Sequence, residues 1–255
     1  MNVTKLNYYS NEANKHYAGY SQIKSFSQCE ARCLAEINGK YEREETTSLL
    51  VGSYIDEYFN GGSDFLNFVE QHPEMFKRDG TLKSEFEKAG DIIRRIERDD
   101  VLHSYLTGER QVIMTGAIMG VPIKIKIDSL KDDKIVDGKV MKDFSDVWSD
   151  EDNAYVPFWR AYSYDWQAFI YQEIVRQNTG KTLPFVLAAA TKEKVPLIRA
   201  YKFSNETIAN ARIEVCNILP RLKDVKNGDV APAACGDCDY CRDKIVIKQN
   251  EFEII

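Results

Sequence analysis

The run from Gly120 to Asp143, GVPIKIKIDSLKDDKIVDGKVMKD, constrains the fold of this chain more than any other segment. Within residues 121–130, isoleucines alternate with lysines and then Asp128, which is the period-two pattern of a strand with one apolar face. Residues 131–134 are polar and suit a turn, and residues 135–141 predict a second strand. The segment therefore predicts an antiparallel β-hairpin.

Three reactive side chains fall on this hairpin. Asp128 lies on the polar face of the first strand, and Asp137 and Lys139 share one side of the second. If the strands pair antiparallel, the two acids can converge across the ladder. Carboxylates suit a hard cation such as Mg²⁺ or Mn²⁺, and a lysine beside them can orient water against a phosphodiester. The pattern therefore predicts nuclease chemistry, although Asp-Gly-Lys at a strand end is also typical of a solvated sheet edge.

Four separated blocks of the chain resemble one family. Asp128 followed by Asp137-x-Lys139 resembles the signature of the PD-(D/E)xK nuclease superfamily. The blocks are TTSLLVGSYID at 46–56, the hairpin region at 120–144, YDWQAFIYQE at 164–173 and CGDCDYCR at 235–242. Together they resemble the phage and prophage exodeoxyribonuclease VIII-like family, which is related to RecE and to the RecB nuclease domain.

The resemblance implies an α/β (α+β) fold with a restriction-endonuclease-like core, in which helices flank a mixed central β-sheet and extra helices precede it. We expect a single nuclease domain over residues 1–255. Its parts would be a mainly helical segment at 1–100, a catalytic core at 108–203, and a C-terminal helix with a cysteine tail at 204–255. Periodicity and capping residues predict helices at 21–39, 47–59, within 63–100 and at 205–219, and further strands at 111–119, 185–190 and 197–203.

The resemblance also implies a metal site with a Mg²⁺ or Mn²⁺ cofactor. Asp128 and Asp137 would be its main carboxylate ligands, Asp56 would complete the shell, and the backbone carbonyl of Gly138 would add a ligand. Lys139 would position or deprotonate the attacking water and stabilise charge on the phosphate.

A helix motif and one departure from the family pattern complete the predicted site. Gln167 and Tyr171 match the Q-x-x-x-Y motif of RecB-like nucleases, and their spacing places both on one helix face, toward the site or DNA. Relatives usually carry a bulky aliphatic residue where this chain has Gly138. A glycine still offers its carbonyl as a ligand, but its extra backbone freedom could loosen the site and reduce activity.

Cysteines form a second group. The chain has six, which are Cys29, Cys33, Cys216, Cys235, Cys238 and Cys241. The last three form C-x2-C-x2-C, a spacing that suits a metal better than disulfides and requires a fourth, distant ligand. Those RecB-like relatives that contain an iron–sulfur cluster hold it with one N-terminal and three C-terminal cysteines, a similar order that implies Cys29 as the fourth ligand. The spacing leaves a [4Fe-4S] cluster, Zn²⁺ or free thiols open. Cys33 could replace Cys29, and Cys216 is predicted to lie in the core.

The charge balance restricts how the chain could hold DNA. A net charge of −6 disfavours non-specific adhesion, because phosphate affinity comes mainly from lysine and arginine. DNA contacts should therefore be local, and we predict them at Lys124, Lys126 and Lys142. No apolar run is long enough to span a bilayer and no signal peptide is apparent, so a cytoplasmic location is expected.

The resemblance implies a Mg²⁺-dependent exodeoxyribonuclease that acts on DNA ends in phage-type recombination or repair. It also implies a single-strand annealing protein as partner, and a homo-oligomer is compatible with it. Two alternatives stay open. One is an endonuclease or single-strand-specific nuclease of the same fold, and the other is a catalytically weakened DNA-binding recombination scaffold.

Overall fold

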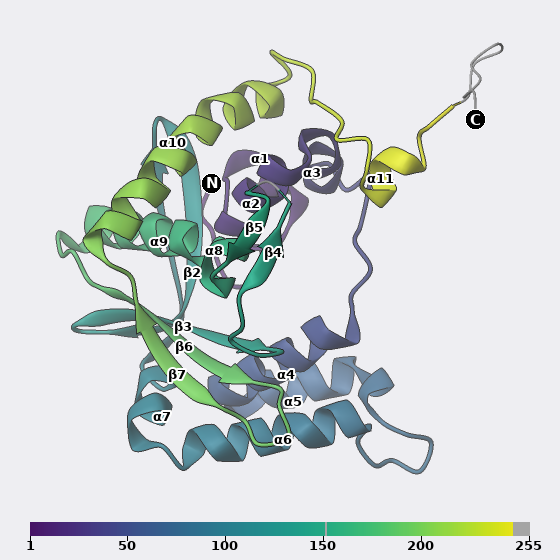
Figure 1. The fold of residues 1–255 in the computed structure, drawn as a ribbon, viewed down its shortest axis with the longest axis vertical. Coiled ribbons are helices and arrows are strands. Elements are labelled where there is room, and N and C mark those ends of the chain that lie inside the picture. The colour runs from purple at the N-terminus through teal and green to yellow at the C-terminus, as the bar shows by residue number, and fades with distance from the viewer. Residues whose placement is uncertain (151, 247–255) are drawn as a thin grey trace.

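A mixed five-stranded sheet forms the centre of the structure, a computed structural model that describes residues 1–150 and 152–246 (Figure 1). The strand order is β1-β2-β3-β6-β7, and the β3–β6 pair alone is parallel within it. The strands are β1 (Glu109–Ile118), β2 (Val121–Lys131), β3 (Lys134–Met141), β6 (Phe185–Thr191) and β7 (Ile198–Lys202). This arrangement confirms the predicted mixed sheet flanked by helices.

The predicted hairpin is formed by β2 and β3, and it is short. Its pairs are Ser129 with Val136, Leu130 with Ile135, and Lys131 with Lys134. On its other edge, β3 pairs with β6 along its whole length except the first residue. Asp128 and Asp137 would form the next hairpin pair, so both acids stand where the ladder between β2 and β3 has ended.

Helices cover both faces of the sheet (Figure 1). On one face lie α4 (Thr47–Asn60), α6 (Ser84–Glu97) and α7 (Asp100–Leu106), with α5 (Gly62–Gln71) packed on α4. On the other lie α9 (Tyr164–Thr179) and α10 (Asn205–Asn227), with α2 (Tyr20–Gln28) and α3 (Glu30–Ile37) beside them. The shorter elements are α1 (Asn11–His16), η1 (Pro73–Met75), β4 (Val147–Ser149), β5 (Ala154–Val156), α8 (Phe158–Ala161) and α11 (Asp239–Arg242).

Alternating residues of the central strands supply two separate cores. Ile135 and Leu187 face α9 and α10, whereas Val136 and Val186 face α4 and α6. The segment within 63–100 is helical as predicted, and its later apolar residues are buried. None of the described helices is long and apolar enough to cross a membrane.

The helix predicted at 21–39 is instead two helices that meet at Cys29. The backbone of Cys29 is extended, with φ −163° and ψ 108°, and its sulfur accepts the backbone N–H of Arg32 at 3.5 Å. Cys29 therefore caps α3. The prediction of one continuous helix was wrong, because the apolar spacing continues across the cap and does not reveal it.

The C-terminal helix is longer than predicted. It runs to Asn227 through Pro220 and ends at Gly228, whose left-handed backbone forms the C-cap. Leu222 and Val225 are buried beyond the proline and extend the apolar stripe, which holds the final turns against the core. Of the predicted cysteine tail, residues 247–255 lie outside the described residues.

Candidate active site

The centre of the site is the buried carboxylate of Asp137 on β3. Asp137 is 2% exposed and forms an ion pair with Lys139, two residues along the same strand. Its Oδ1 accepts a hydrogen bond from Nε2 of Gln167 at 2.6 Å. Burial raises the pKa of Asp137 to about 7, although the Lys139 ammonium acts in the opposite direction. A carboxylate placed here needs a cation beside it.

Two further acids converge beside Gly138. The backbone N–H of Gly138 donates to Oδ2 of Asp128 at 3.0 Å, which fixes that carboxylate across the end of the hairpin. A Cβ atom at position 138 would lie 3.6 Å from Oδ1 of Asp56 and 3.9 Å from Oδ2 of Asp128. Asp56, from α4, and Asp128, from β2, therefore share the space that the missing side chain leaves open.

Burial and the neighbouring acid shift the pKa of Asp56. Burial and then the nearby Asp128 carboxylate raise the pKa of Asp56 well above its usual range, against the attraction of Lys139. Burial opposes the charge of Lys139 itself, but Asp137 and Asp128 more than offset it and hold the pKa of Lys139 above its usual value. Three acids stand here against two cationic side chains, Lys139 and Arg110, and a divalent cation could neutralise the remaining negative charge.

A small cavity lies among these groups. Its volume is about 10 Å³, which is room for the centre of a single water-sized occupant. Eleven residues line it, and they are Ile55, Asp56, Phe59, Ile96, Leu106, Arg110, Asp128, Gly138, Lys139, Val140 and Ala188. Most of the wall is apolar, and its charged members are the acids and bases of the site.

The contacts of the Lys139 ammonium indicate whether the predicted ligands could surround a metal cation. Besides its ion pair with Asp137, Lys139 Nζ lies 3.3 Å from the carbonyl oxygen of Gly138. One positive group therefore already contacts two of the four predicted metal ligands. All four ligands offer oxygen atoms, the donor type that Mg²⁺ and Mn²⁺ prefer. The residues fit such an ion.

The two residues of the helix motif reach the site in different ways. Gln167 bonds directly to Asp137, and both residues are buried. Tyr171, one turn further along α9, donates to the backbone carbonyl of Lys126 at 3.1 Å and is 7% exposed. Tyr171 thus contacts β2 two residues before Asp128, where it can hold the strand in place.

The three lysines predicted to bind DNA lie in different environments. Lys124 is 3% exposed, and its ammonium donates to the carbonyl of Tyr8 and, at 2.7 Å, to Oδ1 of Asn14. The prediction that Lys124 contacts DNA is corrected, because β2 is covered here by the N-terminal segment. Lys126 is half-buried and lies over the ring of Tyr9, whereas the side chain of Lys142 is 94% exposed.

Sequence reasoning missed Arg110 on β1, which lines the cavity beside Asp56 and Asp128. The guanidinium donates to Oδ1 of Asn60 on α4 through Nε at 3.1 Å and Nη2 at 2.7 Å. The adjacent Gln111 has a left-handed backbone with φ 55°. The local signal in the sequence is weak, a polar Glu-Arg-Gln run that opens an otherwise apolar strand.

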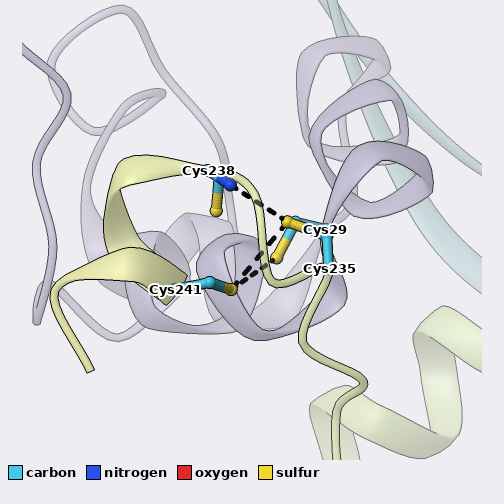
Figure 2. A group of neighbouring side chains, drawn as sticks. All are labelled: Cys29, Cys235, Cys238 and Cys241. Carbon is cyan, nitrogen blue, oxygen red and sulfur yellow. Dashed lines mark hydrogen bonds between the residues drawn. The ribbon is translucent and has the colours of Figure 1, made fainter. Parts of the chain in front are cut away.

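The predicted cysteine site is assembled by segments about 200 residues apart in the chain (Figure 2). The sulfurs of Cys29, Cys235, Cys238 and Cys241 all lie within 4.8 Å of one another. Cys29 Sγ is 3.6 Å from Cys241 Sγ, and Cys235 Sγ is 3.9 Å from Cys241 Sγ. None of the four forms a disulfide. Backbone N–H groups, chiefly that of Cys238, lower the pKa of Cys235 to about 6, which favours a thiolate there.

The other two cysteines lie apart from this group. Cys33 is fully buried and donates to the carbonyl of Gln22, and burial raises the pKa of its thiol to about 12. Cys216 is partly buried against the core. Cys29, not Cys33, therefore joins the C-terminal cysteines.

Known proteins resemble this chain in sequence and in fold. Residues 19–244 match a family described as "PDDEXK-like domain of unknown function (DUF3799)". The crystal structure of a protein described as "Putative exonuclease", from Eubacterium rectale, is similar with a TM-score of 0.93 and 43% sequence identity. The similarity covers 99% of this chain and 97% of that one. None of the curated proteins matches this chain.

Proposed function

Because the chain belongs to the PDDEXK-like family of the PD-(D/E)xK nuclease superfamily, we propose that it is a divalent-metal-dependent exodeoxyribonuclease acting at DNA ends. The observation that carries this proposal is the position of Lys139. Its ammonium lies between the Asp137 carboxylate and the Gly138 carbonyl, beside a cavity that Asp56 and Asp128 also line. The likeness to the protein described as "Putative exonuclease" supports the choice of exonuclease over endonuclease.

In the proposed reaction, Asp56, Asp128, Asp137 and the Gly138 carbonyl would hold a Mg²⁺ or Mn²⁺ ion. The bound ion would polarise a phosphate oxygen and make water more acidic. Lys139 would hold the attacking water and offset the negative charge that grows on the phosphate. Gln167 would keep Asp137 oriented through its 2.6 Å hydrogen bond, so that the acid stays paired with Lys139.

Few positively charged side chains would help to hold the DNA strand at this site. Lys126 and Lys142 are the remaining predicted contacts, and a chain of net charge −6 offers little general attraction for phosphate. We therefore propose that DNA is held locally, near the hairpin. A role in phage-type recombination, with a single-strand annealing protein as partner, rests on the sequence resemblance alone.

One digestion experiment separates the candidate functions. Purified protein is incubated with end-labelled linear DNA and with closed circular DNA, each with and without Mg²⁺. Mg²⁺-dependent loss of linear DNA, with the circle intact, supports an exonuclease. Cutting of the circle favours the endonuclease alternative. Tight binding with no cleavage of either substrate would refute the enzyme and favour a recombination scaffold.

For the cysteine group, we propose a single tetrahedral ion, with Zn²⁺ as the best candidate. With Zn–S bonds of about 2.3 Å, tetrahedral geometry places sulfurs about 3.8 Å apart. The separations of 3.6 and 3.9 Å are close to that value. In a [4Fe-4S] cluster each cysteine binds a different iron, which spreads the sulfurs further. Elemental analysis of the purified protein decides between zinc and iron.

A further inference from the structure

Asn60, the last residue of α4, is the acceptor for side chains from β1. Its Oδ1 takes hydrogen bonds from Nε and Nη2 of Arg110 and, at 3.2 Å, from Nε2 of Gln111. Arg110 Nη2 also lies 3.4 Å from the carbonyl oxygen of Asp56, one turn earlier on the same helix. These contacts tie the helix turn that carries Asp56 to the strand beside Asp128.

The backbone of β1 is strained at this point. Gln111 has φ 55° although it is not a glycine, and its side chain is 9% exposed. A left-handed residue of this kind costs free energy and persists where surrounding contacts hold it. The β1–β2 pairing includes Arg110 with Ser129 and Val112 with Ile127 but omits Gln111 with Asp128. Asp128 therefore has no ladder partner in β1, just as it has none in β3.

One donor of this group has no acceptor among the described residues. Nη1 of Arg110 is buried and makes no hydrogen bond, and Arg110 lines the cavity with Asp56, Asp128 and Lys139. An unsatisfied buried donor is costly, which points to an acceptor that arrives with the cation or substrate. The guanidinium is therefore part of the site's electrostatics as well as its framework.

We propose that Arg110 is a positioning residue of the nuclease site, and that Asn60 is its anchor. Through its hydrogen bonds to Asn60, Arg110 holds the final turn of α4 against β1. The Asp56 carboxylate then stays beside Gly138, where it can share a divalent cation with Asp128. This inference rests on the proposed function. It adds two residues to the site that none of the motifs contains.

The test is Mn²⁺ binding measured by isothermal titration calorimetry, without DNA. Mn²⁺ is used because it prefers oxygen to thiolate ligands, so the cysteine group interferes little. Arg110→Lys and Asn60→Leu both keep a positive charge beside the acids but remove the clamp. Each is expected to weaken Mn²⁺ binding about tenfold or more, the usual effect of losing a residue that supports a ligand. Arg176→Lys, a change in a surface ion pair, serves as the matched control.

Asn60→Asp separates positioning from general stability. Its carboxylate oxygen can still accept from Arg110 and Gln111, so Mn²⁺ binding should return to near the wild-type value. Binding as weak as in Asn60→Leu would overturn the proposal, and so would wild-type affinity in Arg110→Lys. Melting curves without Mn²⁺ show which variants are folded, and Asn60→Ala replaces Asn60→Leu if that variant unfolds. Failure of the wild-type protein to bind Mn²⁺ would instead count against the proposed function itself.

Discussion

The backbone N–H of Gly138 donates to the carboxylate of Asp128 at 3.0 Å, across the position where β2 and β3 cease to pair. A side chain thus replaces the ladder hydrogen bond that a regular hairpin would place here. The arrangement requires room above position 138, since a Cβ atom there would already lie 3.2 Å from Cδ2 of Leu106. The absence of a side chain at Gly138 is therefore part of the geometry of the site.

Larger side chains at position 138 should weaken metal binding at the site progressively. Gly138→Ala should be tolerated, because the end of the Leu106 side chain can shift by a few tenths of an ångström. Gly138→Val would place methyl groups toward Asp56 and Asp128, and we expect the Mg²⁺ concentration for half-maximal cleavage to rise about tenfold or more. Adding Leu106→Ala to Gly138→Val should recover part of the loss. A valine variant with the wild-type Mg²⁺ requirement would contradict this account of the glycine.

Removing either member of the Asp137–Lys139 ion pair should abolish cleavage while the fold survives. Asp137→Asn keeps the shape and can still accept from Gln167, and Lys139→Met keeps most of the apolar stem. We expect cleavage rates on linear DNA to fall by at least about 10²- to 10³-fold in each, the size of losing one charge-stabilising group. Lys202→Met, at an exposed lysine of β7, is the control. Activity retained in both site variants would mean that other residues perform the reaction.

The fold and the acidic part of the site were largely predictable because their signals are local. Period-two alternation marks the β2 strand, and the two acids lie near the turn that joins the hairpin. Lys124 shows the limit of this reasoning. Alternation assigns it to the polar face correctly, but only the tertiary packing of the N-terminal segment reveals that this face is covered there.

Contacts between distant segments account for the rest of what was missed. Arg110 and Asn60 meet across 50 residues, and neither belongs to a periodic pattern or a motif. The break at Cys29 is also invisible to helix periodicity, since it depends on a sulfur that serves as a cap and approaches the C-terminal cysteines. Such features arise from the assembled fold rather than from the local sequence.

Cys29→Ser should remove the metal from the cysteine group and lower the stability of the protein. Serine is a good helix cap, so α3 keeps its cap while the thiolate ligand is lost. We expect the bound metal to disappear and the free energy of unfolding to fall by at least about 2 kcal/mol, because a clip that closes a loop of this length is removed. Elemental analysis and urea unfolding measure these effects, with Cys216→Ser as the control. Unchanged metal content and stability would show that Cys29 is not a ligand of a stabilising ion.

The ammonium of Lys226 joins α10 to the N-terminal helices, and its burial should make stability depend on pH. Lys226 Nζ donates to the carbonyls of Asn14 at 2.8 Å and Tyr17 at 3.0 Å, and to Oε1 of Gln22 at 3.0 Å. Burial lowers the pKa of Lys226 from 10.5 to about 8. Between these values the unfolded chain binds more protons than the folded one, so folding gains stability as the pH rises.

The variant Lys226→Met has no titrating group at this position. Comparison with the wild type therefore isolates the contribution of Lys226 to the pH dependence of stability. At pH 7 the variant should be less stable by about 1–3 kcal/mol, because buried carbonyls lose their donor. As the pH rises from about 8 toward 10.5, the stability of the wild type relative to the variant should increase, by at most about 1.4 kcal/mol per pH unit. Urea unfolding at several pH values measures this difference, with Lys223→Met on the exposed side of α10 as the control. A difference that stays constant or shrinks over that range would show that Lys226 remains charged in the folded protein.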